Sequence, residues 1–398
     1  MSEKFPWPVD DGGQARTYHV LKELARARAT ALVAHSPGDP SGISRIQALG
    51  VDVACRGARS SSWTAPLYAA LSTFTRAPYP MRKNRSRALL TEIRRRIESG
   101  GVGVLHLNHL DSAQYVEDLG ALRERVLCVF DTHNLLTTMY ERFHATAKGA
   151  LKRGFLSLQW MKMGRYEREI MRQMDLVLVC SEVERKLLHT WGLERVLVVP
   201  NGVDLDHYTP IEWRRKAERE PPLVVFTGAM GYAPNADAVS WFLDAVLPLV
   251  RAEVGHVLLR VVGKDPPPSL SARAQRGAIE FTGYVDDVRP HMNEARVFVC
   301  PLRIGGGTRL KILDAMSQEI PVVSTTVGAE GLAVTADENI VLADDPHAFA
   351  AAVVALLRDE ARARRIAAAG LELVRARYGW TAVTRPLIDA LAQPRADR

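Results

Sequence analysis

The sequence contains few cysteines, and no pattern that would pair them. Its 398 residues include four, Cys55, Cys128, Cys180 and Cys300, and none belongs to a Cys-x-x-Cys pair. All four lie in or beside apolar runs, which is typical of reduced and buried thiols. The spacing therefore argues against a disulfide-stabilised secreted protein and against a structural zinc site.

Long apolar runs are also lacking. No segment reaches the roughly 18 consecutive apolar residues that indicate a membrane-spanning helix. No signal-peptide pattern precedes the first periodic segment. We therefore expect a cytoplasmic protein.

Two nucleotide-binding signatures are missing as well. No Gly-x-Gly-x-x-Gly follows an apolar run, which disfavours a dehydrogenase of the dinucleotide-binding type. The stretch "GGGTRLK" is not a P-loop, because Lys311 comes after Thr308 and inside the helix predicted for 308–318. A conventional ATPase is therefore disfavoured too.

Acidic residues are outnumbered by basic ones, and the formal net charge is +7. Much of the excess is local, in the region 82–96 near Phe74 and Tyr79, with Arg82, Lys83, Arg85, Arg87, Arg94, Arg95 and Arg96. The favoured interpretation is a solvated helix face. The alternative is a peripheral contact with the anionic inner face of a membrane, or with an anionic acceptor. No nucleic-acid-binding motif accompanies these residues, so we expect no nucleic-acid partner.

Apolar runs alternate with helical patterns along the whole chain. In the first half the runs occupy 29–35, 51–55, 102–107, 126–131, 175–180 and 195–199. A second series begins with "LVVFTG" and continues through "HVLLRVVG", "IEFTGYV", "RVFVCPL", "IPVVSTT" and "ENIVLA", with helices that include 236–250, 308–318 and 346–377. This alternation predicts an α/β fold of parallel strands with crossover helices.

The pattern breaks near "NGVDLDHYTP", and the charged stretch "IEWRRKAEREPP" that follows is typical of a linker. We therefore predict two doubly wound, Rossmann-like domains, 1–207 and 208–379, with a last helix at about 380–395 that returns to the first domain. Ligands of such sheets bind at the carboxyl ends of the strands, so we expect the site in the cleft between the domains.

The start of the first domain departs from this pattern. Such a domain usually opens with an apolar strand that leads into its first glycine loop. Here Gly12 and Gly13 follow only a few residues, and "MSEK" is too short and polar for a central strand. We expect the first strand to be truncated.

The stretch "CPLRIGGGTRLKILDAM" combines a buried strand, a glycine turn, a helix start and two cations. Backbone N–H groups of a glycine turn and the dipole of the following helix both favour an anion. Arg309 and Lys311 provide charge suited to phosphate oxygens, and Asp314 follows one turn later, where it could accept hydrogen bonds from a vicinal diol such as ribose. The alternative is a surface pair between Lys311 and Asp314 beside a tight loop.

At this point the sequence resembles a known family. "PLRIGGGTRLKILDAMSQEIPVVSTTVGAEGL" is similar to the donor-site signature of retaining glycosyltransferases with the GT-B fold, in glycosyltransferase family four of the group 1 type. Within that family the exopolysaccharide-associated sugar transferases are the most similar. Further matching stretches follow in the family's order over nearly the whole chain: "PWPVDDGGQARTYHVLKEL", "DTHNLLTTMYER", "VCSEVERKLL", "VPNGVDLDHY", "FTGAMGYAPNADAVSWF" and "FTGYVDDVRPHMNEARVFVCPL".

The resemblance implies a retaining hexosyltransferase that needs neither a metal nor a resident cofactor. It would move a sugar from a nucleotide-sugar donor, its substrate, to a glycan or lipid-linked acceptor in cell-surface polysaccharide synthesis. His133 would be the catalytic-site residue that faces the donor sugar; its alternative role is a structural histidine at a strand end. The implied donor-binding residues are Gly12, Gly13, Gly228, Gly263, Tyr284, Val285, Gly306, Gly307, Thr308, Arg309, Lys311 and Asp314.

Two positions depart from the family. The family's Glu-x₇-Glu motif is occupied by Gly306 and Asp314, and the Arg-plus-Lys pair after the first strand of the second domain is missing from "GAMGYAPNAD". Arg309 and Lys311 could supply the missing charge. Two alternatives stay open: a sugar-nucleotide epimerase of the same fold, and a non-catalytic protein that binds a nucleotide or glycan. The base, the sugar and the acceptor are not specified by these motifs.

Overall fold

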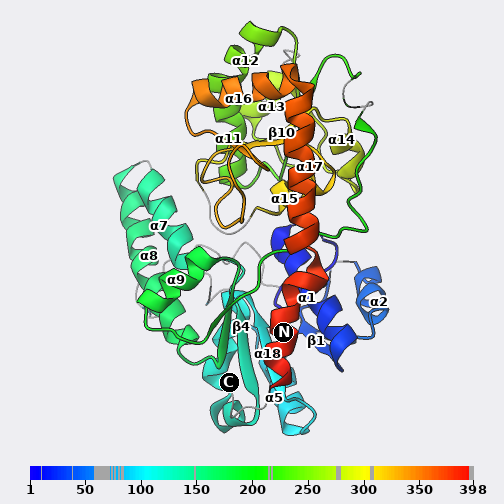
Figure 1. Ribbon diagram of the computed structural model, residues 1–398. Coiled ribbons are helices and arrows are strands. Elements are labelled where there is room, and N and C mark those ends of the chain that lie inside the picture. Colours follow the sequence, from blue (N-terminus) through cyan, green and yellow to red (C-terminus); the bar gives the residue numbers. More distant parts are fainter. Residues whose placement is uncertain are drawn as a thin grey trace. The chain divides into compact units, whose positions relative to one another are not determined.

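The computed structural model describes residues 1–9, 11–37, 39–57, 72, 75, 78, 81, 85–147, 149–213, 216, 218–274, 279–304 and 309–393. The chain divides into two compact units, Met1–Pro200 with Val383–Arg398, and Asn201–Ala382. Each unit contains parallel β-sheet flanked by helices (Figure 1). The predicted α/β class with two Rossmann-like domains is confirmed.

The second unit has one six-stranded parallel sheet. Its strands are β7 (Leu223–Thr227), β8 (Leu258–Val262), β9 (Ile279–Phe281), β10 (Val297–Cys300), β11 (Val322–Ser324) and β12 (Val341–Leu342). Their spatial order is β12-β11-β10-β7-β8-β9, the order of a dinucleotide-binding fold. Every residue of β7 and β10 is buried, as expected for central strands that are covered on both faces.

Helices connect these strands and cover the sheet (Figure 1). They are α11 (Ala233–Trp241), the π-helical turn η4 (Phe242–Val246), α12 (Leu247–Val254), α13 (Pro268–Ala274), α14 (Arg289–Asn293), α15 (Leu310–Ser317), α16 (Pro346–Arg358) and α17 (Glu360–Arg377). The single helix predicted for 346–377 is wrong. Asp359 adopts an extended backbone there, and its side chain accepts a hydrogen bond from the Arg362 N–H, which starts a new helix.

The first unit has the strands β1 (Ala31–Ala34), β2 (Asp52–Cys55), β3 (Val104–Asn108), β4 (Leu127–Asp131), β5 (Leu176–Val179) and β6 (Val196–Val198). They pair in parallel as β1-β2 and as β3-β4-β5-β6. Ser2 bridges Ala34 of β1 and Asn108 of β3, so only this short segment stands between the two groups. The strand in this position is therefore a single bridging residue rather than a full β-strand.

The helical elements of the first unit are α1 (Gly12–Ala27), α2 (Ser41–Gln47), α5 (Arg87–Glu98), α6 (His109–Ala113), η2 (Gln114–Asp118), η3 (Gly120–Arg125), α7 (Leu136–Thr146), α8 (Ala150–Met171) and α9 (Glu182–Thr190). Helices α7 and α8 lie side by side (Figure 1). The last helix, α18 (Trp380–Ala392), starts in the second unit and continues into the first. No helix in the described ranges is both long and apolar enough to cross a membrane.

Two described residues of the charged stretch at 211–222, Trp213 and Lys216, are anchored in the second unit. Trp213 packs against the core of that unit. The Lys216 side chain is fully buried, and its ammonium donates to the carbonyls of Gln318 (2.7 Å) and Glu319 (2.8 Å). These carbonyls lie just past the last residue of α15, Ser317, where a cation is favoured by the helix dipole.

Candidate functional site

The sheet of the second unit reverses its order between β7 and β10. These two strands are neighbours, and the chain leaves β7 toward α11 and β10 toward α15. Such a reversal opens a crevice at the carboxyl ends of the strands, where ligands of this fold bind. Gly228 follows β7, and Lys311 and Asp314 lie on α15, so the sequence order brings these predicted residues to one edge of the sheet.

Two of the predicted glycines contact each other at this edge of the sheet. Gly228 and Gly263 both have a positive φ, 148° and 155°. A Cβ atom on Gly263 would lie 2.1 Å from the Gly228 carbonyl oxygen, and the Gly228 N–H donates to the Val262 carbonyl (2.8 Å). A Cβ on Gly228 would lie 2.8 Å from the Lys311 Nζ atom. Only glycine fits at either position, because backbone and ammonium group occupy the space of a side chain.

Lys311 reaches over the Gly228 turn. Its Nζ atom donates to the Oδ1 atom of Asn235 (2.9 Å) and lies 4.0 Å from the centre of the Phe226 ring. Burial lowers the pKa of this ammonium to about 8. The alternative surface pair with Asp314 does not form, because the described part of the chain shows no ion pair between them and the ammonium turns to Asn235 instead.

Asp314 lies one helical turn beyond Lys311 on α15. It keeps part of its surface exposed, and burial raises the pKa of its carboxyl to about 7. Tyr208 lies near enough for Asp314 to affect its phenol, whose pKa is raised by burial first and by Asp314 second. Asp314 is therefore a carboxyl group that takes up or releases a proton near neutral pH.

The start of α15 differs from the prediction. The helix begins at Leu310, and Arg309 is the residue before its first turn, with an extended backbone. The helix predicted for 308–318 therefore starts later than predicted. Gly306, Gly307 and Thr308 lie outside the described residues. Arg309 itself is buried, 8% exposed.

Tyr284 and Val285 follow β9. Gly283 forms an antiparallel bridge with Gly263, so the loops after β8 and β9 adjoin. Tyr284 is 56% exposed, and the Lys264 ammonium lies 5.8 Å from its ring centre. Val285 is partly buried against the core. An exposed aromatic ring beside the glycine turn is a surface on which a nucleobase can stack.

In the first unit the structure brings Gly13 and His133 together. A Cβ atom on Gly13 would lie 3.5 Å from the His133 Nδ1 atom, and Gly12 is the first residue of α1 beside it. His133 follows β4 with φ at 57°, a left-handed backbone that is rare outside glycine and concentrates at functional sites. Burial lowers the pKa of His133 to about 3, so its imidazole is neutral and has one nitrogen that donates and one that accepts a hydrogen bond.

Behind His133 lies a buried ion pair that the sequence interpretation missed. Arg16 of α1 donates through Nε to both carboxylate oxygens of Asp131 (2.8 and 3.0 Å), and the two side chains are 1% and 0% exposed. Asp131 also lies near the Nε2 atoms of His106 (3.7 Å) and His133 (4.0 Å). Despite burial, the Arg16 guanidinium and the histidines hold the pKa of Asp131 well below its usual range. The pair fixes the strand end from which His133 projects.

The basic region is only partly described. Residues 82–84 and the neighbouring Phe74 and Tyr79 lie outside the described residues. Arg95 and Arg96 both pair with Glu92, Arg96 also pairs with Asp52, and Arg85 pairs with Asp118. Arg95 and Arg96, two of the four arginines on α5, are therefore partly neutralised within the unit, and the peripheral contact stays a prediction.

Asp204 and Asp206 have the Asp-x-Asp spacing of some metal sites. In the structure the Asp204 carboxylate instead accepts hydrogen bonds from the N–H groups of Asp206 and His207, both at 3.2 Å. Among the described residues no group of three or more His, Cys, Asp or Glu side chains is arranged to hold a metal ion.

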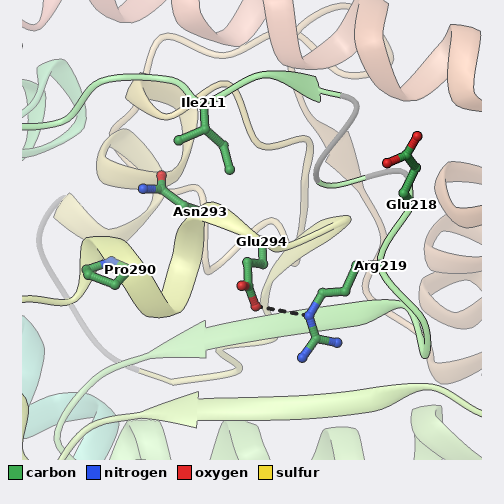
Figure 2. Close-up of a pocket in the computed structure, with 6 residues that line it drawn as sticks. All are labelled: Ile211, Glu218, Arg219, Pro290, Asn293 and Glu294. Atoms are coloured by element: carbon green, nitrogen blue, oxygen red, sulfur yellow. Dashed lines mark hydrogen bonds and ion pairs between the residues drawn. The ribbon is translucent and has the colours of Figure 1, made fainter.

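A surface hollow in the second unit is lined by Ile211, Glu218, Arg219, Pro290, Asn293 and Glu294 (Figure 2). Arg219 and Glu294 form an ion pair on one side of it (3.0 Å). None of the predicted site residues lines this hollow, so it is separate from the Gly228 turn.

Two family models match the sequence. "Glycosyltransferase Family 4" matches residues 11–207, and "Glycosyl transferases group 1" matches residues 221–359. The first match lies in the first unit except for its last residues, and the second lies wholly in the second unit.

Curated relatives are also named as sugar transferases. The chain is 32% identical over 214 residues to the phosphatidyl-myo-inositol mannosyltransferase of Mycobacterium leprae, covering 51% of this chain and 56% of that protein. It is 28% identical over 254 residues to the D-inositol 3-phosphate glycosyltransferase of Xylanimonas cellulosilytica, covering 57% and 59%. The chain thus spans little more than half the length of these two relatives.

Solved structures match over the whole chain. Sucrose-phosphate synthase from Thermosynechococcus elongatus has a TM-score of 0.74 at 18% identity, covering 100% of this chain and 98% of that one. Anabaena HepE in complex with UDP has a TM-score of 0.71 at 12% identity, covering 98% of each chain. These likenesses establish the shared two-domain fold.

Proposed function

The chain belongs to the group 1, family four glycosyltransferases, and we propose from this membership that it transfers a sugar from a nucleotide-sugar donor to a glycan or lipid-linked acceptor with retention of configuration. The observation that carries the proposal is the Lys311 ammonium held over the Gly228 turn, with the Asp314 carboxyl one helical turn away. A cation and a diol acceptor at this spacing suit a diphosphate and the ribose attached to it.

The residues have separate roles in this proposal. Gly228, Gly263 and Lys311 would bind the diphosphate, Asp314 the ribose hydroxyls, and Tyr284 with Val285 the base. His133, neutral and backed by Asp131, would meet the donor sugar as a hydrogen-bonding group. As the sugar leaves, negative charge develops on the diphosphate, and a fixed cation stabilises that charge most in the transition state. The relatives named as mannosyltransferase and inositol phosphate glycosyltransferase, and the neighbour bound to UDP, support a nucleotide-sugar substrate.

The first test is a calorimetric titration with UDP, GDP, ADP and NAD on the wild type and on Asp314→Ala. We expect one nucleoside diphosphate to bind selectively and to bind at least about tenfold more weakly to the variant, because two hydrogen bonds to the ribose are lost. Binding of none of the four nucleotides, or equal binding to both proteins, would contradict the donor site. Product analysis with the matching nucleotide sugar, with and without acceptor, then separates transfer from epimerisation.

The affinity for a nucleotide sugar is expected to depend on pH in a bell shape, with its maximum between about pH 7 and about pH 8. Below this window Asp314 gains a proton and accepts fewer hydrogen bonds; above it Lys311 loses its charge. A nucleotide sugar is the right probe, because the terminal phosphate of a nucleoside diphosphate itself titrates at about pH 6. Asp314→Asn should abolish the acid limb alone, and a flat profile from pH 6 to about 9 would contradict both assignments.

A further inference from the structure

The side chain of Asn235 lies between the β7 turn and Lys311. Asn235 is in the first turn of α11 and is 8% exposed. Its Nδ2 atom donates to the Ala229 carbonyl (2.9 Å), and its Oδ1 atom accepts from the Lys311 ammonium (2.9 Å). A carbonyl can only accept and an ammonium can only donate, so these two partners fix the orientation of the amide.

Asn235 and Lys311 also share the Gly228 turn. A Cβ atom on Gly228 would lie 2.6 Å from the Asn235 Nδ2 atom and 2.8 Å from the Lys311 Nζ atom. The ammonium is thus placed by three features: the amide oxygen, the Phe226 ring and the bare glycine backbone. All three are electrically neutral.

Neutral partners leave the positive charge of Lys311 available. The same helix shows the contrast two residues later, where Asp237 pairs with Arg303 through two hydrogen bonds (2.7 and 3.1 Å) and neutralises it. No carboxylate in the described ranges forms such a pair with Lys311. A partly buried cation without an anionic partner is costly unless an anion completes it, and the Lys311 ammonium lies beside the glycine turn.

We propose that Asn235 is a positioning residue that holds the Lys311 ammonium on the Gly228 turn without neutralising it, so that the donor's diphosphate becomes its counter-ion. This inference rests on the proposed function, because it takes the diphosphate of a nucleotide sugar as the ligand. It also accounts for how the site works without the Arg-plus-Lys pair that its sequence lacks after β7.

The sharpest test is Asn235→Asp, which replaces the amide NH₂ group with an oxygen and adds a negative charge. The new carboxylate would pair with Lys311 and repel the diphosphate, so the affinity for the nucleotide sugar should fall about 100-fold. The alkaline limb of the binding profile should move to higher pH, because a carboxylate stabilises the charged ammonium. Loosened packing alone would weaken binding without moving that limb.

Asn293→Asp is the matched control. It makes the same chemical change in the same unit, at the hollow of Figure 2 beside Arg219 and Glu294. Nucleotide-sugar affinity within twofold of the wild type is expected for it. An equal loss of affinity in both variants would show that any added negative charge in this unit weakens binding, and it would overturn the proposal.

A double-variant cycle covers the case in which the aspartate variant folds poorly. Asn235→Ala should weaken binding about tenfold in the wild type and hardly at all in a Lys311→Met background, because Asn235 acts through Lys311. Equal losses in the two backgrounds would refute a positioning role.

A measurement without nucleotide separates this inference from the proposed function. Lysines labelled by reductive ¹³C-methylation can be titrated by NMR, with the Lys311 signal assigned by its absence in Lys311→Arg. Suppose that the protein binds no nucleotide but that the pKa of Lys311 is higher in Asn235→Asp than in the wild type. That result would support the contact between residue 235 and Lys311 and would reject only the proposed nucleotide-sugar transfer. An unchanged pKa in a protein that does bind nucleotide would reject the inference alone.

Discussion

Lys311→Met is expected to lower turnover with a nucleotide sugar by about two to three orders of magnitude, the loss seen when one preorganised charge-stabilising group is removed from an active site. The variant should nevertheless stay folded, with a melting temperature close to that of the parent, because only one neutral acceptor, the Asn235 Oδ1 atom, loses its donor. Burial already disfavours this ammonium, as its lowered pKa of about 8 shows, and methionine fills a similar volume without charge. Steady-state kinetics and thermal unfolding of the same preparations measure both effects.

Lys216→Met is the matched control for that variant. Lys216 lies in the same unit, and burial lowers its pKa to about 8 as well, but its ammonium donates to the carbonyls at the end of α15. Its loss should reduce stability by about 1–3 kcal/mol, since two buried acceptors lose their donor, while nucleotide affinity stays within a fewfold. Normal turnover in Lys311→Met, or a parallel loss of stability in the two variants, would remove Lys311 from the site.

The strands and their order of appearance were predictable because parallel central strands are continuous apolar runs. Each of the twelve predicted runs overlaps a strand, from β1 within 29–35 to β12 within "ENIVLA". The ends of the helices were harder to predict from the sequence than the strands. The break at Asp359 depends on a single side-chain cap within a long helical pattern, and such a cap has little effect on periodicity.

Some residues of the candidate site were predicted from the sequence, and others were missed. Lys311 stood out as a cation after a strand and a glycine turn, whereas Gly228 and Gly263 were predicted from the family resemblance. The structure brings the three residues into contact. Asn235 did not stand out, because a neutral amide at a helix start carries no periodic or charge signal. Arg16 could have been found: it occupies the buried stripe of α1 with Val20 and Leu24, at a spacing of four residues where only apolar side chains are expected.

Arg16→Met is expected to destabilise the first unit by about 3–5 kcal/mol, the usual cost of leaving one member of a buried ion pair without its partner. Asp131 is 0% exposed and depends on Arg16 for its counter-charge. The double variant Arg16→Met/Asp131→Leu should regain most of this loss, because no buried charge remains. Hydrogen exchange of peptides from β3 and β4, compared with peptides from the second unit, localises the effect to the first unit.

The pH dependence of stability provides a second test of Arg16→Met. In the wild type the pKa of Asp131 is lowered by folding, so its contribution to stability is present above the unfolded pKa and is lost as pH falls. In Arg16→Met the guanidinium is gone, and we expect burial to outweigh the remaining His106 and His133 contacts and to raise that pKa above the unfolded value, so stability should be lost as pH rises instead. This reversal of sign between pH 4 and about 6 cannot arise from lost packing, which is independent of pH.

Arg165→Met provides the control. Arg165 pairs with Glu169 on the surface, with the two side chains 66% and 40% exposed. Removing this pair should change the free energy of unfolding by less than about 0.5 kcal/mol at any pH. A loss in Arg16→Met as small as in that control would show that the buried pair does not hold the strand end of His133.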